Sequence, residues 1–161
     1  MMVKTLLFAL LFNLLALSSM AVWGAVERET FEVYVNIPTA EFYVLPVDPQ
    51  LVQREQRLPY NTVTSELSPL RADYDVKNIN GSIGARLGED AYLSNGHDRI
   101  DLRVKFNDIA LTLDSAQVVS AAQARPGQRV GLEIAAIKPG TGYRPGAYYG
   151  TVHMVFDAIA P

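Results

Sequence analysis

Apolar and polar residues alternate with a period of two at four places in the chain, which is the pattern of a β-strand with one buried face. The four segments are residues 31–37, 99–106, 129–137 and 148–156. In the second segment the apolar side is formed by Ile100, Leu102, Val104 and Phe106. β-Branched and aromatic residues, which favour strands, are frequent at these positions. We predict a strand at each segment.

Two turn signals connect shorter apolar segments. Asn80-Gly81 lies between residues 72–79 and 82–87, and Asn-Gly is a strong signal for a two-residue hairpin turn. We therefore predict that these two segments pair as a β-hairpin. Asn107-Asp108 follows the strand at 99–106 and should turn the chain back on itself. The apolar positions of that return are Ile109, Leu111 and Leu113.

Four further segments carry weaker signals. Residues 40–47 continue the apolar pattern, and residues 57–64 suit a short strand near a sheet edge because Pro59 has no N–H to donate. Residues 50–57 and 115–124 each suit a helical turn or a loop. No segment keeps a helical period over any length, and no repeat is present. Several short strands at regular spacing predict an all-β sandwich.

The amino-terminal residues have the organisation of an export signal. Lys4 precedes a nearly unbroken apolar run at 6–17, and small residues then lead to Ala21. The run is too short to span a bilayer comfortably, and this order of features is typical of a cleaved secretory signal peptide. We assign residues 1–25 to the signal peptide and expect cleavage between Ala21 and Ala25.

Composition limits what the exported chain can be. Removing the leader leaves roughly 136 residues, enough for one domain. The whole chain has a net charge of −3 and the leader carries only Lys4, so the remainder has −3 − 1 = −4. No basic face is visible, which argues against nucleic acid as a partner. The chain has no cysteine, so an exported product cannot depend on disulfides or on cysteine-based metal sites.

The residue pattern does not predict a catalytic or metal site. His97-Asp98 lies in a Gly/Asn-rich segment and is best interpreted as a solvated loop, since a catalytic site needs convergent groups in a pocket. His153 lies within a predicted strand, on the side expected to face solvent or a partner. Two distant histidines without cysteine do not make a three-ligand zinc site. We expect no metal, no cofactor and no enzymatic activity.

Three tyrosines near the end of the chain leave two interpretations open. Tyr143, Tyr148 and Tyr149 can form an aromatic platform for a sugar, as in small secreted lectin-like sandwiches. Alternatively, Tyr148 packs at the rim of the sandwich and the other two contact neighbouring subunits.

The sequence of the last predicted strand resembles that of a known protein family. Its sequence, Pro145-Gly-Ala-Tyr-Tyr-Gly-Thr-Val-His-Met-Val-Phe156, together with an alternating strand just after the signal peptide, resembles bacterial chaperone–usher pilins. Further motifs recur in order, and cysteine is absent. These features are similar to the major subunits of the alternate chaperone–usher class, the CS-type colonisation-factor fimbriae. The motifs are Leu58-Pro-Tyr60, Tyr74-Asp-Val76 with Gly81, the strand pair at 101–106 and 109–113, and Leu132–Ala136.

The resemblance implies a fold and an assembly mechanism. The expected fold class is all-β: an immunoglobulin-like sandwich lacking its final strand, at residues 39–161, with a donor-strand extension at 26–38. The donor inserts Phe31, Val33, Val35 and Ile37 into the groove of the next subunit. The closing strand lines that groove with Gly150, Val152, Met154 and Phe156, and the strand facing it cannot be identified from the sequence. The family's start also favours Val26 as the mature amino terminus.

The resemblance also implies partners and a location. The expected partners are identical subunits, a periplasmic chaperone, an outer-membrane usher and a tip adhesin subunit, and the expected location is a surface fimbria reached through the periplasm. Two other classes of function stay open: a stand-alone secreted β-sandwich that binds carbohydrate or protein, and a small exported enzyme.

Overall fold

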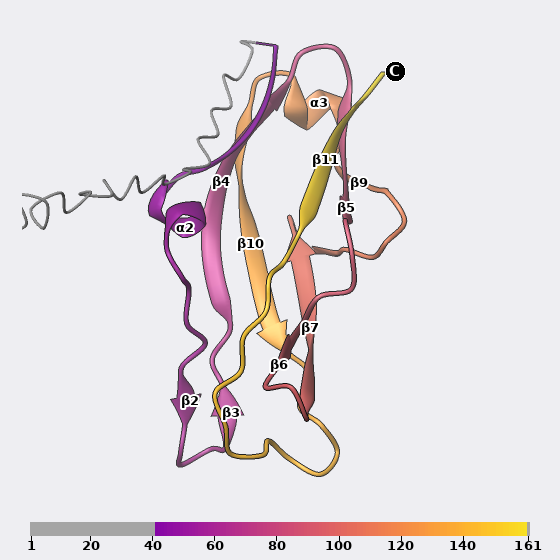
Figure 1. The fold of residues 1–161 in the computed structure, drawn as a ribbon. Helices are drawn as coiled ribbons and strands as arrows, with labels where there is room; N and C mark the ends of the chain where they lie inside the picture. Colours follow the sequence, from indigo (N-terminus) through magenta and orange to yellow (C-terminus); the bar gives the residue numbers. More distant parts are fainter. Residues whose placement is uncertain (1–40, 161) are drawn as a thin grey trace, which may run out of the picture. The chain divides into compact units, whose positions relative to one another are not determined.

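The computed structural model describes residues 41–160, and these residues form an almost entirely β structure (Figure 1). The signal peptide predicted at 1–25 and the donor strand predicted at 26–38 lie outside the described residues. The expected fold class, an immunoglobulin-like β-sandwich, is confirmed for the part of the chain that the structure describes.

The larger sheet has six strands, and all of its pairs are antiparallel. The strand order along the main path is β1-β4-β10-β7-β6, and β8 pairs with β7 off this path. Because β1 and β6 are the ends of the path, β1 is an edge strand among the strands that the structure describes. The bounds are β1 Phe42–Pro46, β4 Leu70–Asn78, β10 Gln128–Ala136, β7 Arg99–Phe106, β6 Tyr92–Ser94 and β8 Ile109–Ala110.

Within residues 41–160 the smaller sheet has three antiparallel strands in the order β11-β5-β9, which makes β11 an edge strand there. Two short strands, β2 and β3, form a separate hairpin, and two single-turn helices, α2 and α3, lie in the connections. The bounds are β5 Ser82–Leu87, β9 Ala116–Val119, β11 Met154–Ile159, β2 Tyr60–Asn61, β3 Glu66–Leu67, α2 Gln50–Gln53 and α3 Ala121–Ala124.

The hydrophobic core lies where the inner faces of the two sheets meet. Phe106 of β7 and Ile83 of β5 are fully buried, and Val76 of β4 packs in the same cluster. Burial of these faces is the main driving force for the fold, since the chain has no disulfide. The alternation predicted at 99–106 is confirmed, because every second residue of β7 is buried. The strand predicted at 129–137 is confirmed as β10.

The hairpin predicted around Asn80-Gly81 is wrong, because β4 and β5 belong to different sheets. β4 already pairs on both sides, with β1 and with β10, so the chain crosses from one sheet to the other at this turn. The Asn78 side chain donates a hydrogen bond across the crossing to the Ser82 carbonyl oxygen, at 2.7 Å. Glycine is required at position 81 because a Cβ there would collide with the Ile159 carbonyl oxygen of β11.

The closing strand is shifted from its predicted position. Its ladder with β5 begins at Met154 rather than Tyr148 and continues past Phe156 to Ile159. The preceding residues touch the larger sheet instead, through the bridge between Tyr149 and Ser94. The chain therefore changes partner before the ladder starts, which residue alternation cannot reveal.

Three shorter segments also differ from the structure predicted for them, because the pairing of strands in the folded chain overrides the local residue pattern. The strand predicted at 57–64 is reduced to β2, and the segment at 115–124 contains the strand β9 as well as the helical turn α3. In the return after β7, only Leu111 is buried, whereas Ile109 and Leu113 are exposed. The segment at 50–57, which suited either a helical turn or a loop, forms the helical turn α2 at Gln50–Gln53.

Candidate functional site: an open groove between two edge strands

The closing strand β11 has one paired edge and one open edge among the described residues. The backbone N–H of Gly88, next to the end of β5, donates to the carbonyl oxygen of His153 at 2.9 Å. The backbone N–H and C=O of His153 therefore point toward β5, and so do those of every second residue after it in β11. In an antiparallel strand the peptide groups of alternate residues point to opposite sides. Those of Met154, Phe156 and Ala158 therefore face the open edge, where an added strand could pair.

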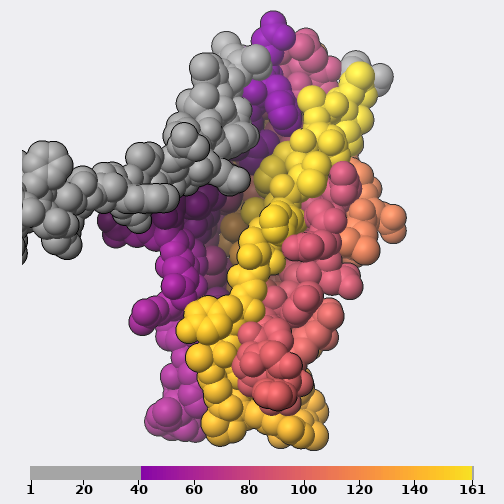
Figure 2. All heavy atoms as spheres, in the orientation of Figure 1, coloured from indigo at the N-terminus to yellow at the C-terminus, as the bar shows by residue number. Residues whose placement is uncertain are grey.

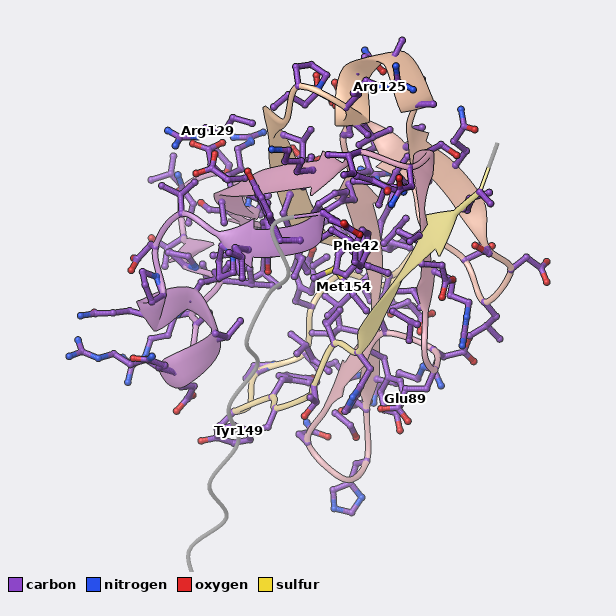
Figure 3. All side chains as sticks on the ribbon, turned by 90° about the horizontal axis from the view of Figure 1, so that it is seen from above. Phe42, Glu89, Arg125, Arg129, Tyr149 and Met154 are labelled. Carbon is purple, nitrogen blue, oxygen red and sulfur yellow. The ribbon has the colours of Figure 1, made fainter. Side chains whose placement is uncertain are left out.

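The strand facing β11 across this gap is β1, which is the edge of the larger sheet and pairs only with β4 among the described strands. The backbone N–H of Val47, just after β1, donates to the carbonyl oxygen of Asp73 in β4 at 2.8 Å. This hydrogen bond extends the pairing of one edge of β1 with β4. Phe42 of β1 and Met154 of β11 lie between the ribbons of the two sheets (Figure 3). Both pack against the core from their own sheet. This identifies the facing strand that the sequence left unassigned.

The floor of the gap is apolar and only half covered. Val152, Met154 and Phe156 are each half-buried on the inner side of the closing segment. The Phe156 ring lies 4.9 Å from that of the fully buried Phe106, so it connects the floor directly to the core. The Tyr74 ring lies 5.4 Å from Phe106 and 6.4 Å from Phe156. We call the apolar depression between β1 and β11 the groove.

The groove contains a hollow of about 420 Å³, next to Val152 and Met154. The opposite wall comes from the segment after β1, which includes α2. In Figure 2 the closing segment is yellow. It runs between the indigo and magenta residues that follow the start of β1 and the rose-coloured residues of β5 to β7. The main apolar residues around the hollow are Leu51, Leu58, Leu70, Leu93, Val152 and Met154.

The sequence missed the leucines of this wall. Leu51 lies in a polar segment that suited a helical turn or a loop, and Leu58 lies in a segment predicted as a short edge strand; both are half-buried against the core. Isolated leucines within polar segments are the signal that could have identified them. Of the residues predicted to line the groove, Val152, Met154 and Phe156 share one face, as expected. Gly150 lines the hollow but is itself exposed, and a Cβ there would collide with the Tyr92 carbonyl oxygen.

The three tyrosines of the carboxyl-terminal segment have different surroundings. The Tyr143 ring meets the Tyr60 ring edge-on at 6.1 Å between centroids. Tyr148 is half-buried, and its hydroxyl donates to the Arg144 carbonyl oxygen at 3.1 Å. Tyr149 is 67% exposed and projects from the surface (Figure 3). Tyr148 packing at the rim agrees with one of the two interpretations left open by the sequence.

Ion pairs lie on the outer face of the larger sheet, away from the groove. Arg129 of β10 donates two hydrogen bonds to Asp75 of β4, at 2.8 and 3.1 Å, and the two residues are direct cross-strand neighbours. Arg71 and Glu133 form a second pair at 2.9 Å in the same two strands. The hydrogen bond from Arg129 lowers the pKa of the Asp75 carboxyl below its ordinary value.

This lowered pKa predicts that Arg129→Ala reduces the stability of the fold slightly, and that the reduction depends on pH. A carboxyl whose pKa is lowered by folding adds stability at pH values above its unfolded pKa, about 3.9, and loses it as the pH falls through the folded value. Arg129→Ala should unfold at a slightly lower urea concentration than wild type at pH 7, and the difference should vanish in acid. Arg103→Ala is the control, since Arg103 lies on the same outer face and has no hydrogen-bonded carboxylate among the described residues. A difference that grows in acid would contradict the assignment.

Neither histidine belongs to the apolar floor of the groove. His97 is in the loop between β6 and β7, where its backbone N–H donates to the Asn95 side-chain oxygen at 2.9 Å. The His153 Nε2 lies 3.4 Å from a Glu89 carboxylate oxygen, and both side chains are largely exposed. Among residues 41–160 there is no cluster of His, Cys, Asp or Glu suited to a metal ion. Within the same residues, no helix has the length and apolar character needed to cross a bilayer.

Comparison with known proteins links this geometry to a family. Residues 27–157 match the family described as CS1 type fimbrial major subunit. Among solved structures, the chain is similar to the CooA pilin subunit from enterotoxigenic Escherichia coli, with a TM-score of 0.52 and 17% identity, over 61% of this chain and 74% of that chain. A search of curated proteins found no match. The family match spans most of the chain, including the described sandwich, so this protein belongs to the CS1-type fimbrial major subunit family.

Proposed function

We propose that this protein is the major structural subunit of a surface fimbria and that its copies are joined by donor-strand exchange. Family membership supports the structural role in a fimbria. The observation that carries the mechanism is the groove: both sheets end on the same side in edge strands, with half-buried apolar side chains between them. A strand from another copy can pair with β11 and cover that floor.

The donor is the segment at residues 26–38, which inserts Phe31, Val33, Val35 and Ile37. Full burial of such side chains stabilises by about 1.5–3 kcal/mol each, so four of them supply several kcal/mol before backbone pairing is counted. A donor strand must leave the groove as a unit, which makes dissociation slow as well as unfavourable. Because the chain contains no cysteine, no disulfide contributes to the link.

The open groove also supports a role for a chaperone before assembly. An unpaired edge strand beside exposed apolar side chains is prone to pair with the wrong molecule. A periplasmic chaperone occupies the groove until an outer-membrane usher brings the next donor strand, and a tip adhesin subunit begins the filament. The chain reaches the surface through the periplasm, supports adhesion as part of the fimbria and catalyses no reaction.

The test is to express the full chain with and without its chaperone. The account predicts little soluble subunit without the chaperone, a one-to-one complex with it, and fibres when the usher is also present. A stand-alone secreted β-sandwich would instead be a soluble monomer without any chaperone, and this result would overturn the proposal.

The covalent state of the fibres gives a separate prediction. Because only strand insertion and packing join the subunits, a thiol reductant should leave fibre length unchanged by electron microscopy. Dilution should also leave fibres intact for hours. Fibres that fall to monomers within minutes of dilution would contradict a link made by a whole inserted strand.

A further inference from the structure

The segment that connects β1 to β2 forms the wall of the groove opposite the closing segment. We call residues 48–58 the strap; they include the single-turn helix α2. Two strap residues, Leu51 and Leu58, are half-buried and pack against the core, and all the others are exposed. The polar strap residues on the rim of the hollow are Arg54, Glu55 and Gln56. The strap therefore turns two leucines toward the groove and a polar surface toward solvent.

Hydrogen bonds among its own residues hold the strap together. The Asp48 carboxylate accepts from the backbone N–H of Gln50 at 2.9 Å, and the Leu51 N–H donates to the Asp48 carbonyl oxygen at 3.1 Å. The side-chain amide of Gln56 lies within hydrogen-bond distance of three strap carbonyl oxygens, those of Gln50, Leu51 and Arg54, at 3.2, 3.4 and 3.2 Å. Gln56 therefore ties the end of the strap to the turn of α2.

Few contacts join the strap to the rest of the sandwich. Two hydrogen bonds of 2.8 Å hold the chain just outside it, from the Val47 N–H to the Asp73 carbonyl oxygen and from the Ser68 N–H to the Pro59 carbonyl oxygen. Between these anchors, no hydrogen bond or ion pair among residues 41–160 connects the strap to another element. Its two leucines make its contact with the core. A segment with few buried apolar contacts and exposed backbone hydrogen bonds opens at a low cost in free energy.

We propose that the strap is a latch, which closes on the donor strand of the neighbouring copy and slows the release of that strand from the groove. This inference rests on the donor-strand mechanism proposed above. Protein interiors keep few voids larger than a water molecule, so the walls around the hollow of about 420 Å³ must close on the segment that enters. The strap is a wall that moves at low cost, and Leu51 and Leu58 then pack on the donor.

A latch of this kind controls how long the donor stays in the groove. It is not needed for folding of the subunit, because the strap adds only two half-buried side chains to the core. Gln56 acts as a positioning residue, since its amide holds the strap in the shape that presents both leucines to the groove. Loss of this amide should therefore change the rate of donor release and leave the folding of the subunit as it is.

Dissociation of assembled fibres in guanidinium chloride tests the latch. Gln56→Ala removes the amide and leaves both leucines in place. Gln53→Ala is the matched control, because Gln53 is exposed in α2 and its side chain forms no hydrogen bond with another described residue. Gln56→Lys is the rescue, since an ammonium group also donates to carbonyl oxygens. Leu51→Ala removes one of the two leucines. For each variant, the recovery of chaperone complex, the yield of surface fibres and the rate at which fibres lose subunits are measured.

The expected result is a normal recovery of complex and fibres from the three glutamine variants. Gln56→Ala fibres should dissociate about three to ten times faster than wild type, the change that follows from losing one net hydrogen bond. Gln53→Ala and Gln56→Lys fibres should dissociate like wild type, and Leu51→Ala fibres at least as fast as Gln56→Ala fibres.

Equal dissociation rates for wild type and Gln56→Ala would overturn the latch and leave donor-strand insertion intact, even if Leu51→Ala failed to fold. Dissociation of Gln53→Ala or Gln56→Lys as fast as that of Gln56→Ala would also overturn it, because the effect would not depend on the hydrogen bonds of the strap. Wild-type fibres that fall to monomers on dilution would count against the donor-strand mechanism itself.

Discussion

Phe156→Asp is expected to remove the chaperone-bound subunit from the periplasm. The Phe156 ring packs 4.9 Å from Phe106, which is fully buried, and so belongs to both the core and the groove floor. Removing a core phenylalanine ring costs about 3–5 kcal/mol, and placing a carboxylate beside Phe106 and Tyr74 adds a desolvation cost. Domains are stable by only about 5–15 kcal/mol, so little folded subunit should survive. Recovery of the one-to-one complex measures this.

Thr151→Asp is the matched control for Phe156→Asp. It introduces the same charge into the same segment, at a residue that is exposed. The control should yield normal amounts of complex. Equal loss of complex from both variants would show that the segment tolerates no charge at all, and would contradict a specific role of the inward face.

Val35→Asp should leave recovery of the chaperone complex normal and should abolish surface fibres, which separates it from Phe156→Asp. Its own sandwich does not contain its own donor strand in the proposed mechanism, so folding of the subunit is spared. The new carboxylate would have to enter the neighbour's apolar groove, at a cost of several kcal/mol unless it becomes protonated. Fibre yield should therefore fall by at least an order of magnitude, as measured by quantitative blotting of sheared surface material.

Tyr34→Asp is the matched control for the donor. Position 34 alternates with Val33 and Val35, so its side chain points away from the groove in the proposed register. Fibres of Tyr34→Asp should form nearly as well as wild type. If Tyr34→Asp abolished fibres and Val35→Asp did not, the register of the donor would be off by one residue.

The central strands could be predicted from the sequence because local pattern and tertiary environment agree there. In β7, alternation of Ile100, Leu102, Val104 and Phe106 reflects one face on the core and one in solvent, and all four are buried. β10 follows the same rule. The inner face of the closing segment, with Met154 and Phe156, was predictable for the same reason.

The remaining features depend on which strands pair, and alternation does not encode pairing. Asn80-Gly81 has the residues of a hairpin turn, yet the chain crosses between sheets there because both edges of β4 are already occupied. The wall of the groove could not be predicted either. Leu51 and Leu58 are separated from the closing strand by about a hundred residues of sequence, and only the folded sandwich places them around the same hollow.

The most direct test of the account is to complete the sandwich within one chain. Residues 39–161 would be followed by a flexible Gly/Ser linker and residues 26–38, and thermal unfolding of this fusion would be measured without chaperone. The account predicts a soluble monomer with one cooperative transition, which Val35→Asp in the attached strand lowers strongly. A chain of residues 39–161 alone that unfolds at the same temperature as the fusion would show that the sandwich is already complete, and would contradict the proposed mechanism.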